Sequence, residues 1–275
     1  MNIGFIGAGR VGCSLGKYFI MHGFNVSGYH SRSQESACLA AELTETKAFE
    51  TMEELVHNSD VVFLTVLDGM ISSVWKKINN PELSNRTVVH CSGAMTSEVF
   101  DGAIENMGVV SMHPLMAVST KNQDLSGAFF TIEGNSKGKN TVIEILTKCG
   151  NSYQEISMES KVKYHAAAAV SSNLVTGILD MALEMFKDCG FSDENARKAI
   201  RPLVEGNVKA VMDMGAGPAL TGPVSRRDYE TVQKHMEVLS GDELEIYRLL
   251  SLRLLDMTGD KNASEYMKVK GVLLK

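Results

Sequence analysis

The chain has little of what marks several classes of protein. Its 275 residues include one tryptophan, five prolines and five cysteines. The cysteines are odd in number, widely spaced and form no C-x-x-C pair, so neither a disulfide framework nor a zinc site is predicted. No apolar run approaches the about 18 residues of a membrane span, and no basic segment precedes the apolar start at Ile3. We therefore expect a cytoplasmic protein with no membrane anchor and no signal peptide.

An excess of basic charge is also lacking. The chain has 27 Lys and Arg against 33 Asp and Glu, which gives a net charge of -6. This balance argues against nucleic acid or an anionic membrane as the main partner. The apolar content of 44% and the charged content of 22% are typical of a folded globular protein. A small-molecule substrate is the expected partner, and any anion must be bound by a local arrangement of residues.

The first half of the chain alternates short β-rich runs with helical segments, which predicts a mostly parallel, doubly wound α/β sheet. The expected strands are residues 2–6, 25–30, 60–66, 87–91, 109–113, 129–133 and 153–156. The expected helices among them are residues 11–22, 34–43, a helix opening at residue 51, and 139–149.

After about residue 157 the β-rich runs stop. Helices are expected at residues 161–189, 193–214, 226–239 and 242–258. We therefore predict a sheet domain over residues 1–157 and an all-α domain over residues 158–275. The cleft between two such domains is the expected substrate site.

A glycine-rich turn follows the first expected strand. Gly7, Gly9 and Gly12 fit G-x-G-x-x-G between a strand and a helix. The first glycine permits a tight turn, the second lets the backbone approach a pyrophosphate, and the third allows helix and strand to pack closely. The helix start adds unpaired N–H groups and partial positive charge. The residues predicted to bind a dinucleotide here are Gly7, Ala8, Gly9, Arg10, Val11 and Gly12.

The end of the second expected strand indicates which dinucleotide. An NAD-specific protein usually has an acidic residue there for the ribose hydroxyls. This chain has Ser31, Arg32 and Ser33 instead. A guanidinium flanked by hydroxyls suits a 2′-phosphate, so we predict NADP (NADPH) as the cofactor. The alternative is a solvated loop that only caps the next helix.

Ligands of open α/β sheets lie beyond the carboxyl ends of the strands. Further cofactor contacts are therefore predicted at the ends of two strands: Thr65, Val66, Leu67, Ser92 and Gly93. Ser92 is also a candidate substrate ligand. His113 ends another strand, and its imidazole is a candidate proton donor near neutral pH. The alternative for His113 is a structural hydrogen bond at a strand end.

The first helix of the all-α domain carries a polar stripe. Lys161, His165 and Ser172 share one helical face and Asn173 is adjacent, so all four can line a pocket. His165 and Asn173 are candidate catalytic residues, and Lys161 and Ser172 are candidate substrate ligands. A solvated face is the alternative. The alanines at residues 166–169 also suit a homodimer interface.

A Gly/Pro-dense segment at residues 215–223 lies between two expected helices and precedes an arginine pair. Glycines permit a close approach of the backbone to a ligand, and a guanidinium can hold a carboxylate. Thr221 and Arg226 are therefore predicted to bind substrate. A plain turn between helices is the alternative.

Five separated motifs together resemble one known group of proteins. They are the glycine turn, residues 90–94 (His-Cys-Ser-Gly-Ala), residues 112–115 (Met-His-Pro-Leu), residues 164–168 with Asn173, and residues 219–228. The chain resembles bacterial Rossmann-like proteins with a C-terminal helical domain long classed as of unknown function. That group is broadly similar to ketopantoate, pyrroline-5-carboxylate and prephenate/arogenate dehydrogenases. One departure is that Lys163 is followed four residues later by Ala167, so the Lys-x-x-x-Asn pair of the hydroxyacid dehydrogenases is absent.

The resemblance implies an NADP-dependent oxidoreductase. Some members resemble an alternative ketopantoate reductase of pantothenate synthesis. The expected substrate is therefore a small oxo acid, and 2-dehydropantoate (ketopantoate) is the first candidate. The histidine of the similar His-Pro-Met-Ala-Gly run in prephenate dehydrogenases is catalytic, which supports His113. The alternatives are an imine or prephenate-type dehydrogenase and a non-catalytic NADP-binding sensor.

Overall fold

The computed structural model describes residues 1–259 and 261–275. The chain forms two compact units, Met1–Asn173 and Leu174–Lys275. Among the described residues all strands belong to the first unit.

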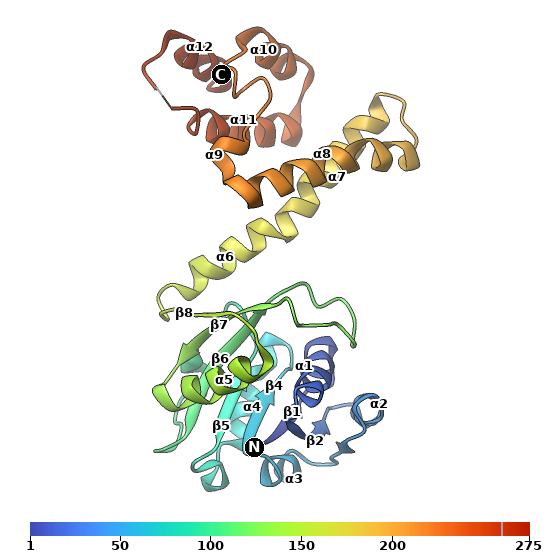
Figure 1. Cartoon of the computed structure of the whole chain (residues 1–275), viewed down its shortest axis with the longest axis vertical. Coiled ribbons are helices and arrows are strands. Elements are labelled where there is room, and N and C mark those ends of the chain that lie inside the picture. Colours follow the sequence, from blue (N-terminus) through green and yellow to red (C-terminus); the bar gives the residue numbers. More distant parts are fainter. Residues whose placement is uncertain (260) are drawn as a thin grey trace. The chain divides into compact units, whose positions relative to one another are not determined.

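The first unit is built on one eight-stranded sheet of order β3-β2-β1-β4-β5-β6-β7-β8 (Figure 1). The strands are β1 Asn2–Ile6, β2 Asn25–His30, β3 Lys47–Ala48, β4 Val61–Leu64, β5 Thr87–His90, β6 Gly108–Leu115, β7 Phe129–Gly134 and β8 Tyr153–Glu155. Neighbouring strands are parallel except β6 and β7. The predicted doubly wound, mostly parallel sheet followed by helices is therefore confirmed.

Helices cover both faces of this sheet. They are α1 Arg10–Met21, α2 Gln34–Thr44, α3 Met52–His57, α4 Asp68–Ile78 and α5 Ser136–Cys149, with short 3₁₀ turns η1 Pro81–Leu83 and η2 Ser97–Phe100. The helix α6 Lys161–Ser171 follows the last strand and is mostly exposed. Alternate side chains of a strand point to opposite faces, so β4 contributes Phe63 to one core and Leu64 to the other. In the first core Phe63 lies 5.3 Å from Phe5, ring centre to ring centre.

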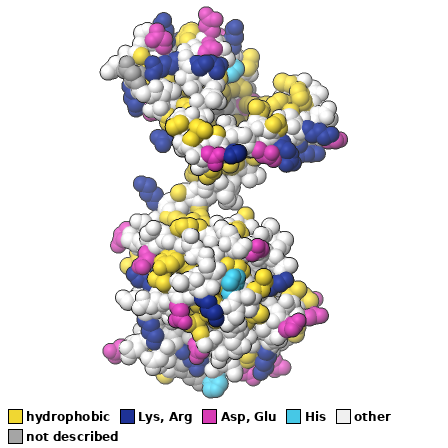
Figure 2. Space-filling model, in the orientation of Figure 1, with side chains coloured by type: hydrophobic (Ala, Val, Ile, Leu, Met, Phe, Trp, Pro, Cys, Tyr) yellow, Lys and Arg dark blue, Asp and Glu magenta, His cyan; other side chains and the backbone are white. Residues whose placement is uncertain are grey.

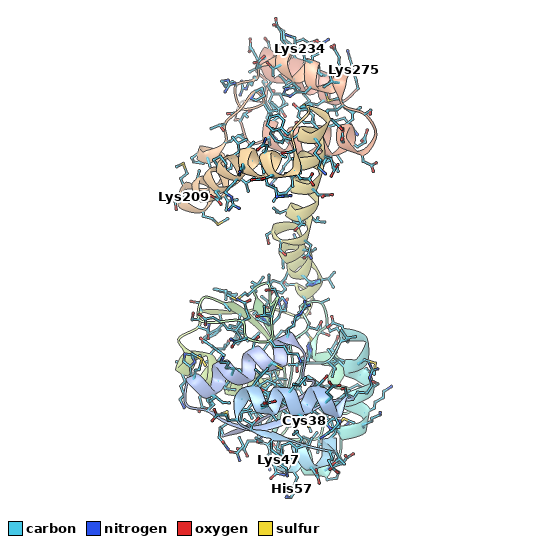
Figure 3. The ribbon with its side chains drawn as sticks, turned by 90° about the vertical axis from the view of Figure 1, so that its right-hand side faces the viewer. Cys38, Lys47, His57, Lys209, Lys234 and Lys275 are labelled. Carbon is cyan, nitrogen blue, oxygen red and sulfur yellow. The ribbon has the colours of Figure 1, made fainter. Side chains whose placement is uncertain are left out.

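Several local features follow the expected chemistry. Thr51 caps α3 by accepting a hydrogen bond from the Glu54 N–H at 3.2 Å, and Gly150 ends α5 in the left-handed conformation. All five cysteines are free, and Cys38 lies exposed on α2 (Figure 3). The short β3 and the helix α4 were not predicted, the first because two residues carry no periodicity.

The helix after the sheet differs from the expectation in two respects. The helix expected at residues 161–189 is broken at Ser172, whose φ of -131° and ψ of -80° are not helical. The compact units divide after Asn173, not at the predicted boundary after residue 157. The reason is that α6 contacts the sheet: Lys161 is fully buried, and Tyr164 hydrogen-bonds His113 on β6.

The second unit is helical throughout its described secondary structure. Its helices are α7 Asn173–Asp188, whose first residue ends the first unit, α8 Asp193–Met214, α9 Ala216–Ala219, α10 Tyr229–Val238, α11 Gly241–Leu255 and α12 Ser264–Leu273. Its core includes Val232, Leu255, Tyr266 and Leu273. The helix α12 was not predicted.

One stretch, Lys161–Asp188 over α6 and α7, contains an 18-residue window whose mean hydropathy of 1.4 is apolar enough to cross a membrane. The expectation concerned an uninterrupted apolar run, and in this stretch serines, a threonine and an asparagine interrupt the apolar residues. Length and composition alone are weak evidence for a span, since the core helix of a soluble protein passes the same test. None of the residues of α7 is buried, and Figure 2 shows hydrophobic side chains on the surface of the helical unit.

Candidate active site

The glycine turn between β1 and α1 has the geometry of a pyrophosphate cradle. Gly7 has a φ of +118°, and a Cβ there would lie 2.6 Å from the carbonyl of Thr65. A Cβ on Gly12 would lie 2.5 Å from the Gly7 carbonyl oxygen, so both glycines permit close packing. A Cβ on Gly9 would have no neighbour within 4 Å. Gly9 therefore keeps space open at the start of α1, where an anion meets backbone N–H groups.

The start of α1 favours an anion. Gly9 is the N-cap, no side chain caps the helix, and its first turn has no acidic residue. The hydroxyl of Thr65 donates to the Gly7 carbonyl at 2.8 Å, and the Gly7 N–H donates to the His30 carbonyl at 2.8 Å. Thr65 thus shapes the turn. The residues present fit the pyrophosphate of a dinucleotide.

The predicted 2′-phosphate loop follows β2. Ser33 caps α2 by accepting a hydrogen bond from the Ser36 N–H at 3.3 Å, so the capping alternative holds for this hydroxyl. Arg32 is exposed and Ser31 is half-buried. Arg32 forms no hydrogen bond or ion pair within the described ranges, so its guanidinium is available to a ligand.

The carboxyl end of β4 presents an apolar side chain. Leu67 is 82% exposed at the start of α4, whereas Val66 packs partly against the second core. Arg10 is exposed beside the glycine turn, and Ala8 and Val11 pack against the first core. The exposed side chain of Leu67 is therefore an apolar surface at the carboxyl end of β4 against which a cofactor ring could pack.

His113, His165 and Gly93 come together at the carboxyl end of the sheet. A Cβ on Gly93 would lie 2.6 Å from His165 Cδ2 and 2.9 Å from His113 Nε2. The two imidazole ring centres are 6.2 Å apart. The absence of a side chain at Gly93 therefore lets both rings approach this turn.

Tyr164 completes this cluster, and it was missed in the sequence. Its hydroxyl lies 2.6 Å from His113 Nδ1, and the two rings are nearly perpendicular. The predicted polar stripe of the helix comprises residues 161, 165 and 172. Residue 164 lies one turn after residue 161 and shares its face. That i, i+3 spacing is the signal that could have found it.

Burial decides the protonation states of this pair. Burial, together with the nearby Lys161 and His165, lowers the pKa of His113 to about 4. Burial also raises the pKa of Tyr164. At neutral pH His113 is therefore uncharged and Tyr164 keeps its proton.

His90 and Ser92 have structural partners. His90 is fully buried, its Nδ1 accepts from the Ser92 N–H at 3.2 Å, and its Nε2 lies 3.2 Å from the Thr96 carbonyl oxygen. The Ser92 hydroxyl donates to Asp68 at 2.7 Å and accepts from two backbone N–H groups that follow it. Both residues thus shape the turn that carries Gly93. Burial raises the pKa of Cys91 to about 12, which argues against a thiolate nucleophile.

The predicted polar stripe is only partly displayed. His165 is exposed, but Lys161 is fully buried and its Nζ donates to the Ser111 hydroxyl. That Lys161 contacts substrate stays a prediction, and its burial means that its side chain is not displayed with the others. Ser172 and Asn173 are exposed and hydrogen-bond each other at 3.1 Å where the helix breaks.

The remaining predicted substrate ligands belong to the second unit. Thr221 lines a hollow of about 390 Å³ between α8, α9 and α11, together with Asn207 and mainly apolar residues. Arg226 is exposed a few residues later. In the first unit a hollow of about 350 Å³ lies between α1 and residues 122–124 and shares no residue with the histidine cluster.

Comparison with known proteins decides the cofactor. Residues 2–93 match the family described as NADP oxidoreductase coenzyme F420-dependent. Residues 128–254 match a domain of unknown function, DUF2520. No curated protein matches the chain significantly. The family match covers the glycine turn, the strand-end residues and Gly93, so NAD(P) is the cofactor and the protein is an NAD(P)-dependent oxidoreductase.

Solved structures share the fold of the whole chain. Protein TM1727 from Thermotoga maritima is 25% identical with a TM-score of 0.76, over 95% of this chain and 100% of that one. Pyrroline carboxylate reductase from Plasmodium falciparum, solved with NADP bound, is 17% identical with a TM-score of 0.60, over 99% and 98%. An imine reductase from Pseudomonas sp. is 16% identical with a TM-score of 0.62, over 98% and 92%. The last two likenesses concern the fold alone.

Proposed function

We propose that this protein is an NADPH-dependent reductase of a small molecule with a C=N or C=O bond. The observation that carries the proposal is the contact of Tyr164 with His113 Nδ1 at 2.6 Å beside Gly93. A protein that only senses NADP needs no proton donor. A reductase needs one beside the carbon that is reduced.

The cofactor sites follow from the residues described above. When bound, NADPH supplies the hydride. Gly9 and the start of α1 hold the pyrophosphate, and Arg32 with Ser31 binds the 2′-phosphate that distinguishes NADP from NAD. Leu67 contacts the ring system at the carboxyl end of β4.

His113 acts as the proton donor in this proposal. Tyr164 keeps its proton and donates it in a hydrogen bond to Nδ1, so the proton of the neutral imidazole lies on Nε2. Nε2 is the nitrogen that faces Gly93. Before the step Tyr164 fixes the tautomer and the ring orientation. The imidazole then donates its Nε2 proton to an uncharged imine nitrogen or a carbonyl oxygen as hydride adds to the carbon, and Nδ1 takes up the Tyr164 proton, which solvent replaces. His165 and Asn173 remain further candidates for this step.

A small imine is the first substrate to test. Lys161, a predicted substrate ligand, is buried, whereas the carboxylate of Asp68 lies exposed beside Ser92. Negative charge at this edge favours an imine, whose nitrogen gains positive charge when it is protonated, over an anionic oxo acid. The fold shared with an imine reductase and a pyrroline carboxylate reductase is compatible with this substrate. Ketopantoate is the second candidate, for which Arg226, Thr221 and Ser172 would supply contacts.

The test is NADPH oxidation measured against a panel of cyclic imines, ketopantoate, other oxo acids and prephenate. We expect turnover with an imine, and its loss in His113→Ala with NADPH affinity retained. The variant His165→Ala reports whether the second imidazole takes part. Tight NADPH binding without turnover on any member of the panel would contradict the proposal and leave the sensor alternative.

We also propose that the protein is a homodimer through its helical unit. The helix α7 has no buried residue, and its exposed side chains include Leu174, Val175 and Ile178. An apolar helix face of this kind is stable in water when another surface covers it. A second copy of the chain supplies such a surface, and the cytoplasm remains the predicted compartment.

A further inference from the structure

A fully buried lysine lies beneath the proposed site. Lys161 is the first residue of α6 and has no exposed surface, although burial of an unpaired ammonium is costly. Its Nζ donates to the Ser111 hydroxyl on β6. Burial lowers the pKa of Lys161 to about 8, so the side chain is still charged at neutral pH.

Hydrogen bonds link this lysine on α6 to Ser111 on β6 and, through Ser111, to the turn at Ser92. Ser111 Oγ accepts from Lys161 and lies 3.3 Å from the Ser92 carbonyl oxygen, to which it donates. Ser92 precedes Gly93, and Ser111 precedes His113 by two residues on the same face of β6. Tyr164 lies one helical turn after Lys161 on the same face of α6.

Two contacts therefore join α6 to β6 in register. One joins Lys161 to Ser111, and the other joins Tyr164 to His113. A helix held at two successive positions along a strand cannot rotate or slide without breaking both contacts. The first contact thus determines where the hydroxyl of Tyr164 meets the imidazole.

The charge of Lys161 is balanced within the sheet. Glu133 on β7 is buried and pairs with Ser111 across the antiparallel strands. Its carboxylate accepts hydrogen bonds from the N–H and the hydroxyl of Ser97 at 2.8 and 2.6 Å. Buried charges of this kind often add little net stability compared with apolar residues of similar size. Stability alone is therefore a poor explanation for this lysine.

We infer that Lys161 is a positioning residue, whose buried ammonium holds α6, β6 and the turn at Ser92 in the arrangement that the reduction needs. The inference rests on the proposed function for its effect on turnover. The expected effect of Lys161 on His113 is independent of the proposed function, because the charge of Lys161 also acts on that imidazole in the free protein. The charged or titratable groups around the His113 imidazole are Lys161, His165 and Tyr164 from α6, Asp68 from α4 and His90 from β5.

The test compares Lys161→Met and Ser111→Ala with wild type. Lys137→Met is the matched control, because Lys137 joins α5 to the backbone carbonyls of Asn85 and Asn106 at the opposite ends of the strands. The imidazole nitrogens of His113 are titrated by NMR in the free protein. NADPH affinity and kcat are measured in the same samples.

In Lys161→Met we expect the pKa of His113 to rise by about one unit or more, because a nearby positive charge is lost. We expect kcat to fall about tenfold or more and NADPH affinity to change less than about twofold, since misplacement affects the reacting groups. In Ser111→Ala we expect the same loss of kcat with a smaller rise in this pKa. Lys137→Met should change neither quantity.

A wild-type His113 titration and a wild-type kcat in Lys161→Met and Ser111→Ala would overturn the inference. If Lys161→Met does not fold, a normal kcat in Ser111→Ala overturns it alone. If no substrate is turned over by wild type, the proposed function has failed but the inference is still tested. In that case an unchanged Nδ1 chemical shift and pKa of His113 in Lys161→Met and Ser111→Ala count against it.

Discussion

The hydroxyl of Tyr164 lies 2.6 Å from Nδ1 of His113, and this contact joins the helix α6 to the strand β6. A second pair of the same type exists in the helical unit, where the Tyr247 hydroxyl lies 2.9 Å from His235 Nδ1. The second pair is remote in the chain from the residues of the proposed site. It therefore offers a matched control for the first.

We expect Tyr164→Phe to lower kcat about 10- to 100-fold with little change in NADPH affinity. The reason is that His113 loses the hydroxyl that fixes its tautomer and ring orientation. Steady-state kinetics with the imine substrate measure the effect. Tyr247→Phe should retain the kcat of wild type, and equal losses in both variants would assign the effect to stability and not to the site.

Gly9→Ala tests whether the space at the start of α1 belongs to the cofactor. A Cβ at Gly9 meets no protein atom within 4 Å, so we expect an unchanged melting temperature. We expect NADPH to bind about tenfold more weakly or worse, because the methyl group occupies the path of the pyrophosphate. Fluorescence titration with NADPH measures this affinity. Gly177→Ala, which is equally unhindered, is the control, and normal NADPH binding by Gly9→Ala would contradict the assignment.

Arg32→Ala tests the preference for NADP. Removal of an exposed guanidinium beside the 2′-phosphate should weaken NADPH binding about tenfold and leave NADH binding within about twofold. The ratio of the two affinities is the quantity to measure. Arg197→Ala in the helical unit controls for a general effect of net charge. An unchanged ratio in Arg32→Ala would assign the preference to other residues.

The buried histidines predict loss of stability in mild acid. Burial lowers the pKa values of His90 and His113 to about 4, from an ordinary value near 6.5. Between these values the unfolded chain binds protons that the folded chain does not. The free energy of unfolding therefore falls as the pH drops from about 6.5 to about 4, by up to about 1.4 kcal/mol per pH unit for each histidine.

Urea unfolding at several pH values measures this slope. His90→Gln should make the slope shallower, because one of the two groups no longer titrates. His57→Gln should leave it unchanged, because His57 is exposed at the end of α3 (Figure 3). A slope that His90→Gln does not alter would mean that His90 contributes nothing to the acid sensitivity.

The proposed homodimer is tested by light scattering after size-exclusion chromatography. We expect the mass of two chains for wild type and of one chain for the double variant Leu174→Glu, Ile178→Glu, because charges on the exposed face of α7 oppose its burial. Leu43→Glu on the exposed face of α2 is the control. A monomeric wild type that partitions onto lipid vesicles would instead indicate that a bilayer covers α7.

Some features were predictable from the sequence because they depend on neighbouring residues. The turn at Gly7, Gly9 and Gly12 is a local pattern; Gly7 and Gly12 are as closely packed as their positions predict, and Gly9 faces open space. The strands β1 and β2 begin and end at the predicted residues, since alternating apolar runs bounded by turns define them. The mostly parallel sheet and the change to helices follow from the order of such segments.

Only the tertiary structure decided the composition of the candidate site. Helical periodicity places Lys161, Tyr164 and His165 on one side of α6, but it cannot show which of them meets β6. Packing buries Lys161 on Ser111, sets Tyr164 against His113 and leaves His165 exposed. These partners, 50 and 51 positions apart in the chain, meet only when the sheet and the helix assemble. The sequence by itself therefore determined the cofactor turn, whereas the partner of each catalytic candidate was decided by the contact between α6 and β6.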